Sequence, residues 1–256
     1  MVKSKESGIM NSQKMDDIGV CVLRVAHERL TKWFENNPPL NFRKIKLVVY
    51  NLLLRANDTT GAILCLYNNG HYSPAMGLTR LMFELAIDVA IIEVNPEKAT
   101  FLDEYNKRMM VKWWKVWSAR DNRYIVFYNQ ALKEFEHLVP LIRREGKEAK
   151  RWMKDRWGNN LRALSQKIDP TGCLTRIYDV VVSTEQVHLH GGLLPECCLP
   201  DNRDVTLHIW DNANYLLDIV EHCRSIFSSH PLPDFADLTK VLDALTTEVL
   251  PKATSS

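Results

Sequence analysis

The sequence predicts an all-α protein, and three observations support that prediction. Glycine is scarce, at 10 of 256 residues, so few turns are expected. Strong helix formers dominate most windows of the chain. Apolar residues recur near the 3.6-residue period of a helix. We therefore expect a single helical domain over residues 1–256, built as one bundle around a buried central helix at about 74–95, with flexible ends at 1–14 and 250–256.

Three helical segments are expected before the central helix. The first covers residues 17–36, where an apolar stripe ends at "NNPPLN". Asn41 is expected to cap the second, which carries a broad apolar face. The stretch "ANDTTGAILCLYNNG" predicts a cap, a short apolar helix and a stop at Gly70.

The central helix has the clearest start signal in the chain. In "YSPAMG", Ser73 is a good N-cap and Pro74 suits the first helical position. The next segments show helical periodicity too, although Val180–Val182 also fits a short strand. "LPECCLPDNRD" is the clearest loop. The remaining helices are expected at residues 96–124, 129–157, 171–190, 205–229 and 234–249.

Composition and charge exclude several classes of protein. Lys plus Arg (33) nearly balance Asp plus Glu (31), so the net charge of +2 predicts no partner. The polar N-terminus lacks the apolar core of a signal peptide, and no apolar run is long enough for a membrane span. The six cysteines form no paired framework. We expect a soluble, cytoplasmic protein with reduced thiols and no membrane contact.

The central helix carries a line of charges. "GLTRLMFELAIDVAII" is apolar on most sides, yet Arg80, Glu84 and Asp88 are spaced four apart and share one face. Charges withdrawn from water must be paired and hydrogen-bonded. Two interpretations follow, namely a structural salt bridge with an ordinary solvent stripe, or a polar functional pocket.

A second polar segment is a candidate to complete such a pocket. "STEQVHLHGG" contains Ser183, His188 and His190 just before a helix stop. A histidine beside a carboxylate and an arginine supplies an acid/base group and an anion anchor, the set needed to cut or transfer at a phosphate. The alternative is that one histidine caps the helix and the other is exposed. Because the two histidines are two residues apart, only one is expected in the site.

These two motifs resemble those of an uncharacterised bacterial family. Its pattern is an Arg-x3-Glu helix, matched by Arg80 and Glu84, and a Tyr...Ser...His-Gly helix, matched by Tyr178, Ser183 and either His188 or His190. The similarity covers about residues 60 to 195. It implies a helical fold, and some members lie near phage-defence genes. The architecture is similar to the nucleotide-binding HEPN superfamily, which implies an RNase or toxin that acts as a homodimer.

HEPN RNases are marked by Arg, four to six residues, and His. The chain contains "RSIFSSH", from Arg224 to His230. In such a motif the arginine holds the scissile phosphate and the histidine activates the 2′-hydroxyl without a metal. The alternative is an ordinary C-terminal turn, because Pro231 follows directly.

Two regions mix cations with tryptophans. Bases stack on exposed tryptophans while cations track phosphates, so this composition predicts an RNA surface. The alternative is that Trp113 and Trp117 belong to the core, with lysine stems around them. The candidate nucleic-acid-binding cations are Lys112, Lys115, Arg120, Arg123, Lys150 and Arg151.

The sequence contains little that indicates a metal site or a cofactor site. His188, His190, Cys197 and Cys198 lack zinc-ligand spacing, and no phosphate-binding, dinucleotide, hydrolase or zincin motif occurs. We expect no metal and no cofactor. The leading function is a bacterial defence- or toxin-type effector that cleaves RNA or a nucleotide. The alternative is a non-catalytic helical module that binds a protein partner in a defence or regulatory complex.

Overall fold

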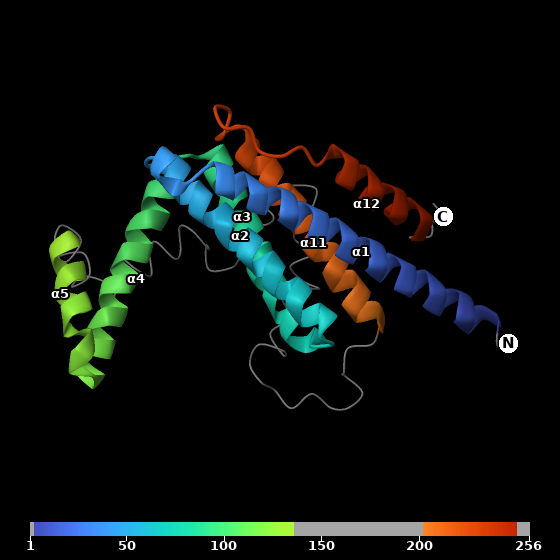
Figure 1. Cartoon of the computed structure of the whole chain (residues 1–256), viewed down its shortest axis with the longest axis horizontal. Helices are drawn as coiled ribbons and strands as arrows, with labels where there is room; N and C mark the ends of the chain where they lie inside the picture. Colours follow the sequence, from blue (N-terminus) through green and yellow to red (C-terminus); the bar gives the residue numbers. More distant parts are fainter. Residues whose placement is uncertain (1–2, 136–201, 250–256) are drawn as a thin grey trace, which may run out of the picture.

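The computed structural model describes residues 3–135 and 202–249, and it confirms the all-α bundle (Figure 1). Within these ranges the chain forms α-helices and short 3-10 turns, without a strand. The elements are α1 (Lys3–Asn36), η1 (Pro39–Asn41), α2 (Ile45–Asn68), α3 (Tyr72–Val94), α4 (Lys98–Arg120), η2 (Asn122–Tyr124), α5 (Ile125–Glu134), α11 (Asn202–Arg224) and α12 (Ala236–Val249). No helix in the described ranges combines the length and hydropathy needed to cross a membrane.

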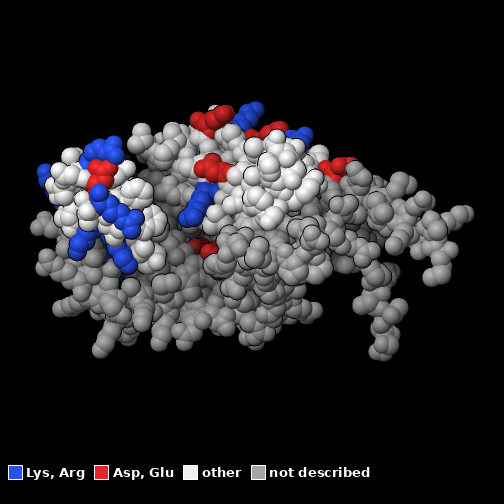
Figure 2. All heavy atoms as spheres, turned by 90° about the horizontal axis from the view of Figure 1, so that it is seen from below, with Lys and Arg blue, Asp and Glu red and all other residues white. Residues whose placement is uncertain are grey.

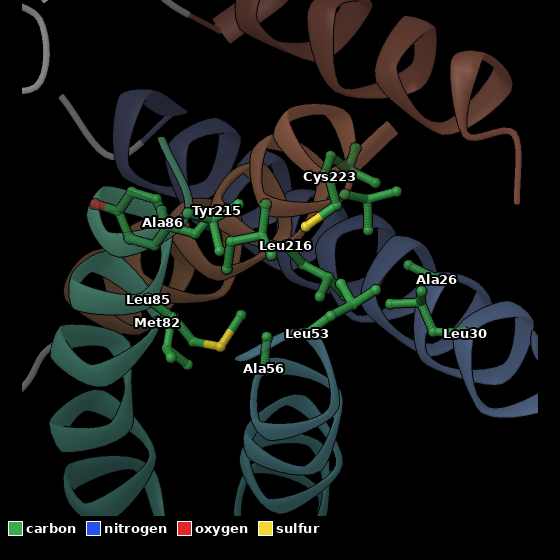
Figure 3. Close-up of a cluster of buried hydrophobic side chains, with 14 of the residues drawn as sticks. Ala26, Leu30, Leu53, Ala56, Met82, Leu85, Ala86, Tyr215, Leu216 and Cys223 are labelled. Atoms are coloured by element: carbon green, nitrogen blue, oxygen red, sulfur yellow. The ribbon is translucent and has the colours of Figure 1, made fainter. Parts of the chain in front are cut away.

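Four helices build the main core. α11 packs against both α1 and α3, and α2 lies against α3 and α1 (Figure 1). Their apolar faces meet in one continuous cluster, in which Leu30, Leu53, Met82 and Leu216 are inaccessible to solvent (Figure 3). The central position of α3 follows from its composition, because apolar side chains cover most of its circumference.

The remaining helices attach to this core at its edges. α12 lies along α1, where Arg29 holds Asp237 through two hydrogen bonds of 2.8 and 2.7 Å. α4 leaves the bundle, and α5 folds back against α4 (Figure 1). These two helices share a small second cluster around Val111, Ala131 and Phe135.

α2 is one continuous helix, so the expected break near Asn57 is wrong. Polar residues favour caps only when their side chains bond the local backbone. Here Asn57 is buried and spans to α1 instead, donating to Thr31 Oγ1 at 3.0 Å and accepting from His27 Nδ1 at 2.9 Å. Thr60 donates to the carbonyl of Ala56 within the helix. The predicted stop at Gly70 is confirmed, with φ of +72°.

The expected caps of α2 and α3 are also wrong. Asn41 lies in η1, and Lys44, with φ of 49°, precedes α2 without a side-chain cap bond. Ser73 lies inside α3, which begins at Tyr72 and ends at Val94 close to the predicted end. The starts of α2 and α3 therefore differ from the predicted ones, while the central helix itself is confirmed.

Other helix ends differ from expectation for local reasons. α1 begins at Lys3 rather than near Asp17, because its polar first turns continue a helix whose later turns are buried. α4 ends at Arg120, since Asp121 is extended and accepts a bond from the Arg123 backbone N–H. α11 starts at Asn202 and ends at Arg224 rather than Ser229. The turn that follows places Phe227 fully inside the core, beside Trp33 and Phe42.

Candidate functional site

Arg80 and Glu84 form an ion pair on α3. Nε of Arg80 donates to Oε1 of Glu84 at 3.1 Å, and the side chains are 26% and 31% exposed. Four-residue spacing on a helix explains the contact. The pair therefore lies at the boundary between the core and solvent, on a helix that is otherwise mostly buried.

The pair lies to one side of the contact between α3 and α11. Thr79 accepts a hydrogen bond of 2.8 Å from Asn212, and the Phe83 ring meets Tyr215 with centroids 5.6 Å apart. Each helical residue turns the side-chain direction by about 100°, so Glu84 and Asp88 point about 100° and about 140° away from Phe83. Glu84 and Asp88 thus face away from α11, whereas Arg80, about 60° from Phe83, lies nearer to that contact.

Asp88 is the most buried member of the ladder of Arg80, Glu84 and Asp88. Asp88 is only 6% exposed, in contrast to the half-buried Arg80 and Glu84. Among contacts between described residues, Arg80 uses only Nε, and its two terminal nitrogens bond no described residue. A planar guanidinium with two available donors matches the oxygens of a phosphate or carboxylate.

Several predicted site residues cannot be placed beside this ladder. Tyr178, Ser183, His188, His190, Lys150 and Arg151 lie outside the described residues. The pairing of an imidazole with Glu84 or Asp88 therefore stays a prediction.

Arg224 and His230 have separate partners. Arg224 bonds Glu221 through Nε, donates to the Pro233 carbonyl at 3.2 Å, and lies 3.7 Å from Asp234. The His230 ring packs edge-on against Phe42, with its Nδ1 3.1 Å from Ser229 Oγ. Within the described ranges no contact joins the arginine to the histidine. These partners favour the alternative of a C-terminal turn, in which Arg224 fastens the chain that leads into α12.

The basic residues of α4 divide into two kinds. Lys112, Lys115 and Arg120 are exposed, and none has an ion pair or hydrogen bond to a described residue. Arg123 differs, because it pairs with Asp121 at 2.6 Å and its hydrogen bonds lower the pKa of that carboxyl. Figure 2 shows Lys and Arg side chains gathered at the end of the molecule formed by α4 and α5.

The tryptophans of α4 also separate. Trp113 and Trp117 are 62% and 53% exposed, so the alternative that they belong to the core is wrong. Trp114 instead packs inward, stacked on Phe127 with centroids 5.0 Å apart. Periodicity alone did not separate these roles, because both sides of α4 are apolar here.

Sequence reasoning missed the polar residues of α11. Asn212 is buried, and its Oδ1 has no partner among the described residues. It lines a cavity of about 10 Å³ with His208, Tyr67 and Tyr72, which is about the volume one water needs. Beside it, burial raises the pKa of Asp211 to about 7. In sequence these residues look like the solvent face of an amphipathic helix.

Metal-ligating side chains do not gather in the described part of the chain. No group of three or more His, Cys, Asp or Glu residues there has the geometry to hold an ion. Asp88 and Glu84 therefore form no such cluster with other described ligands.

The comparisons with known proteins give one match. No curated protein and no solved structure matches the chain. Residues 46–187 match a family of unknown function (DUF5677), a stretch that includes Arg80, Glu84 and Asp88 and ends just before His188. The expected membership in an uncharacterised helical family is confirmed. The chain belongs to the family of unknown function DUF5677.

Proposed function

We propose that the protein is a bacterial defence- or toxin-type effector of the HEPN kind that acts on RNA or a nucleotide in the cytoplasm. Arg80, Glu84 and one histidine, His188 or His190, carry out phosphodiester cleavage, and Asp88, Tyr178 and Ser183 border the site. The observation that supports this proposal is the half-buried Arg80–Glu84 pair, in which the two terminal nitrogens of the arginine bond no described residue.

Energetics favour a ligand-binding role for this pair over a folding role. An ion pair four residues apart on a helix stabilises it by only about 0.3–0.5 kcal/mol. Withdrawing charges from water opposes that gain. The fold therefore loses little if the pair is replaced, whereas an anionic ligand gains a charge-assisted, bidentate anchor.

The proposed chemistry needs no metal. Arg80 binds a non-bridging oxygen of the phosphate and stabilises the charge that develops there. Glu84 orients the imidazole, which takes the proton from the attacking 2′-hydroxyl. The new bond joins the 2′-oxygen to phosphorus, the bond between phosphorus and the 5′-oxygen breaks, and the 5′-oxygen leaves with the proton that the imidazole had taken. As in HEPN RNases, we expect a homodimer to be the active species.

The test is RNA cleavage by the full-length protein in excess EDTA. Arg80→Gln, Glu84→Gln, His188→Ala and His190→Ala are compared with Asp103→Gln and Lys107→Gln, which change another pair four residues apart on α4. We expect Arg80→Gln, Glu84→Gln and one histidine variant each to reduce the rate by roughly 100-fold or more with unchanged melting temperature. The control variants retain the rate. Cleavage that EDTA abolishes, or that survives all four site variants, contradicts the proposal.

A second candidate function has its own observation. Large apolar side chains are exposed on α4 and α5, a feature of protein-interaction surfaces. A non-catalytic module that binds a partner in a defence or regulatory complex would use them. This alternative predicts no RNA cleavage and a stable complex that Arg80→Gln leaves intact.

A further inference from the structure

α4 and α5 present an exposed aromatic surface that packing within the described chain does not explain. The α4–α5 surface comprises the exposed apolar residues Met110, Trp113, Val116, Trp117, Val126 and Phe127. On α4, the spacing of three and four residues places Met110, Trp113 and Trp117 on one side of the helix. Exposing two tryptophans to water is costly, so a cluster of this kind marks a binding site.

Cations accompany this aromatic surface. Arg120 follows Trp113 and Trp117 on the same side of α4, and the exposed Lys112 and Lys115 lie about 100° and about 160° around the helix from Trp113, so their long side chains flank the aromatic surface. None of the three has an anionic partner among the described residues, whereas Arg123 is already neutralised by Asp121. Figure 2 shows this end of the molecule as predominantly basic. The occupant must therefore be both anionic and able to stack on indole rings.

We infer that the α4–α5 surface binds a single-stranded RNA, with Trp113 and Trp117 stacking on its bases and Lys112, Lys115 and Arg120 contacting its phosphates. Stacking requires accessible base faces, which a duplex does not offer at its interior. A second copy of this chain fits less well, because a symmetric contact would bring the same three cations together. This inference rests on the proposed function only in taking RNA as the substrate.

Trp114 has a different role from its neighbours. Its ring is stacked between the second cluster and Phe127, with Tyr124 6.0 Å away. Trp114 therefore packs beneath the α4–α5 surface, between α4 and α5, whereas the rings of Trp113 and Trp117 are accessible to bases. Replacement of Trp114 is therefore not a test of binding.

The experiment measures binding of a fluorescent oligouridylate of about ten nucleotides, within the length range such surfaces cover. The full-length protein carries Glu84→Gln, so that cleavage does not interfere. Trp113→Leu with Trp117→Leu keeps an apolar surface and removes the indole rings. Lys112→Gln, Lys115→Gln and Arg120→Gln together remove the cations. Arg24→Gln with Arg55→Gln is the matched control, because both arginines are exposed and unpaired on α1 and α2 within the described chain.

We expect the leucine pair to weaken binding by roughly fivefold or more for each tryptophan lost. The logarithm of affinity should fall with the logarithm of salt at a slope of about −2 for three phosphate contacts, and the glutamine triple variant should flatten that slope. Duplex RNA and inorganic polyphosphate should compete poorly. The control variant should bind as the parent does.

Three results overturn the inference. Binding that the leucine pair leaves unchanged excludes stacking. Equal affinity for duplex RNA excludes single-strand recognition. A dimer in light scattering that Trp113→Glu converts to a monomer, without RNA binding, assigns the surface to self-association. Cleavage measured separately in the wild-type background distinguishes failure of this surface from failure of the Arg80–Glu84 site.

Discussion

Asp211 on α11 offers a sharp test of the packing around the bundle core. Its carboxyl is half-buried, it has no hydrogen bond to a described residue, and burial raises its pKa from 3.8 to about 7. Asn has the same shape without the charge. We therefore expect Asp211→Asn to stabilise the protein at neutral and alkaline pH, because the variant removes a carboxylate that the fold disfavours.

The sign and size follow from proton linkage. The folded state holds the Asp211 proton up to about pH 7, whereas the unfolded chain releases it near pH 3.8. The contribution of Asp211 to stability is therefore greatest below pH 3.8 and falls as pH rises to about 7. A shift of about three pKa units corresponds to an upper limit of about 4 kcal/mol. Because water partly screens this half-buried group, we expect about 2 kcal/mol.

Urea unfolding at pH 4, 6 and 8 measures this effect. The difference in unfolding free energy between Asp211→Asn and wild type should be small at pH 4, grow to pH 7 and then stay constant. Asp58→Asn, at an exposed position on α2, provides the control and should show no such growth. A difference that is independent of pH, or a destabilised Asp211→Asn variant at pH 8, would show that the fold does not disfavour the Asp211 carboxylate.

Three further substitutions test other contacts. Phe227→Ala should destabilise the protein by about 3–5 kcal/mol, because it removes a fully buried ring that packs against Trp33 and Phe42, and chemical denaturation measures this loss. Asn57→Ala should cost about 1–3 kcal/mol, since His27 and Thr31 lose their partner; a thermal scan that shows no change would exclude a role for this network. Arg29 lowers the pKa of Asp237 to about 2. The contact between Arg29 and Asp237 therefore stabilises the fold above pH 4, and this stabilisation is lost as pH falls toward 2. Acid unfolding of the Asp237→Asn variant should lack that loss. A midpoint of acid unfolding equal to that of the wild type would contradict a stabilising contact.

The sequence predicted the fold class and the central helix because both depend on composition and local signals. Pro74 near its start and Pro96 just beyond its end bracket α3. The continuity of α2 was not predictable, because Asn57 favours a cap until a partner from α1 satisfies it. Tertiary contacts thus override the local preference of a polar residue.

The candidate site could be predicted only in part from the sequence. Four-residue spacing predicted the contact between Arg80 and Glu84. Spacing does not report exposure, however, so the sequence left open whether Trp113 and Trp117 lie outward or in the core. The burial of Asp211 was missed because a carboxylate in an amphipathic helix gives no sign in the sequence that the fold withdraws it from water.

The central claim is that the Arg80–Glu84 pair serves a ligand and not the fold. A double-mutant cycle on Arg80 and Glu84, with folding and RNA cleavage measured in the same samples, tests it most directly. If the pair serves a ligand, Arg80→Gln, Glu84→Gln and the double variant should each change the free energy of unfolding by less than about 1 kcal/mol. Cleavage should fall by roughly 100-fold or more. A loss of more than about 2 kcal/mol of stability with an unchanged cleavage rate would show that the pair serves the fold instead.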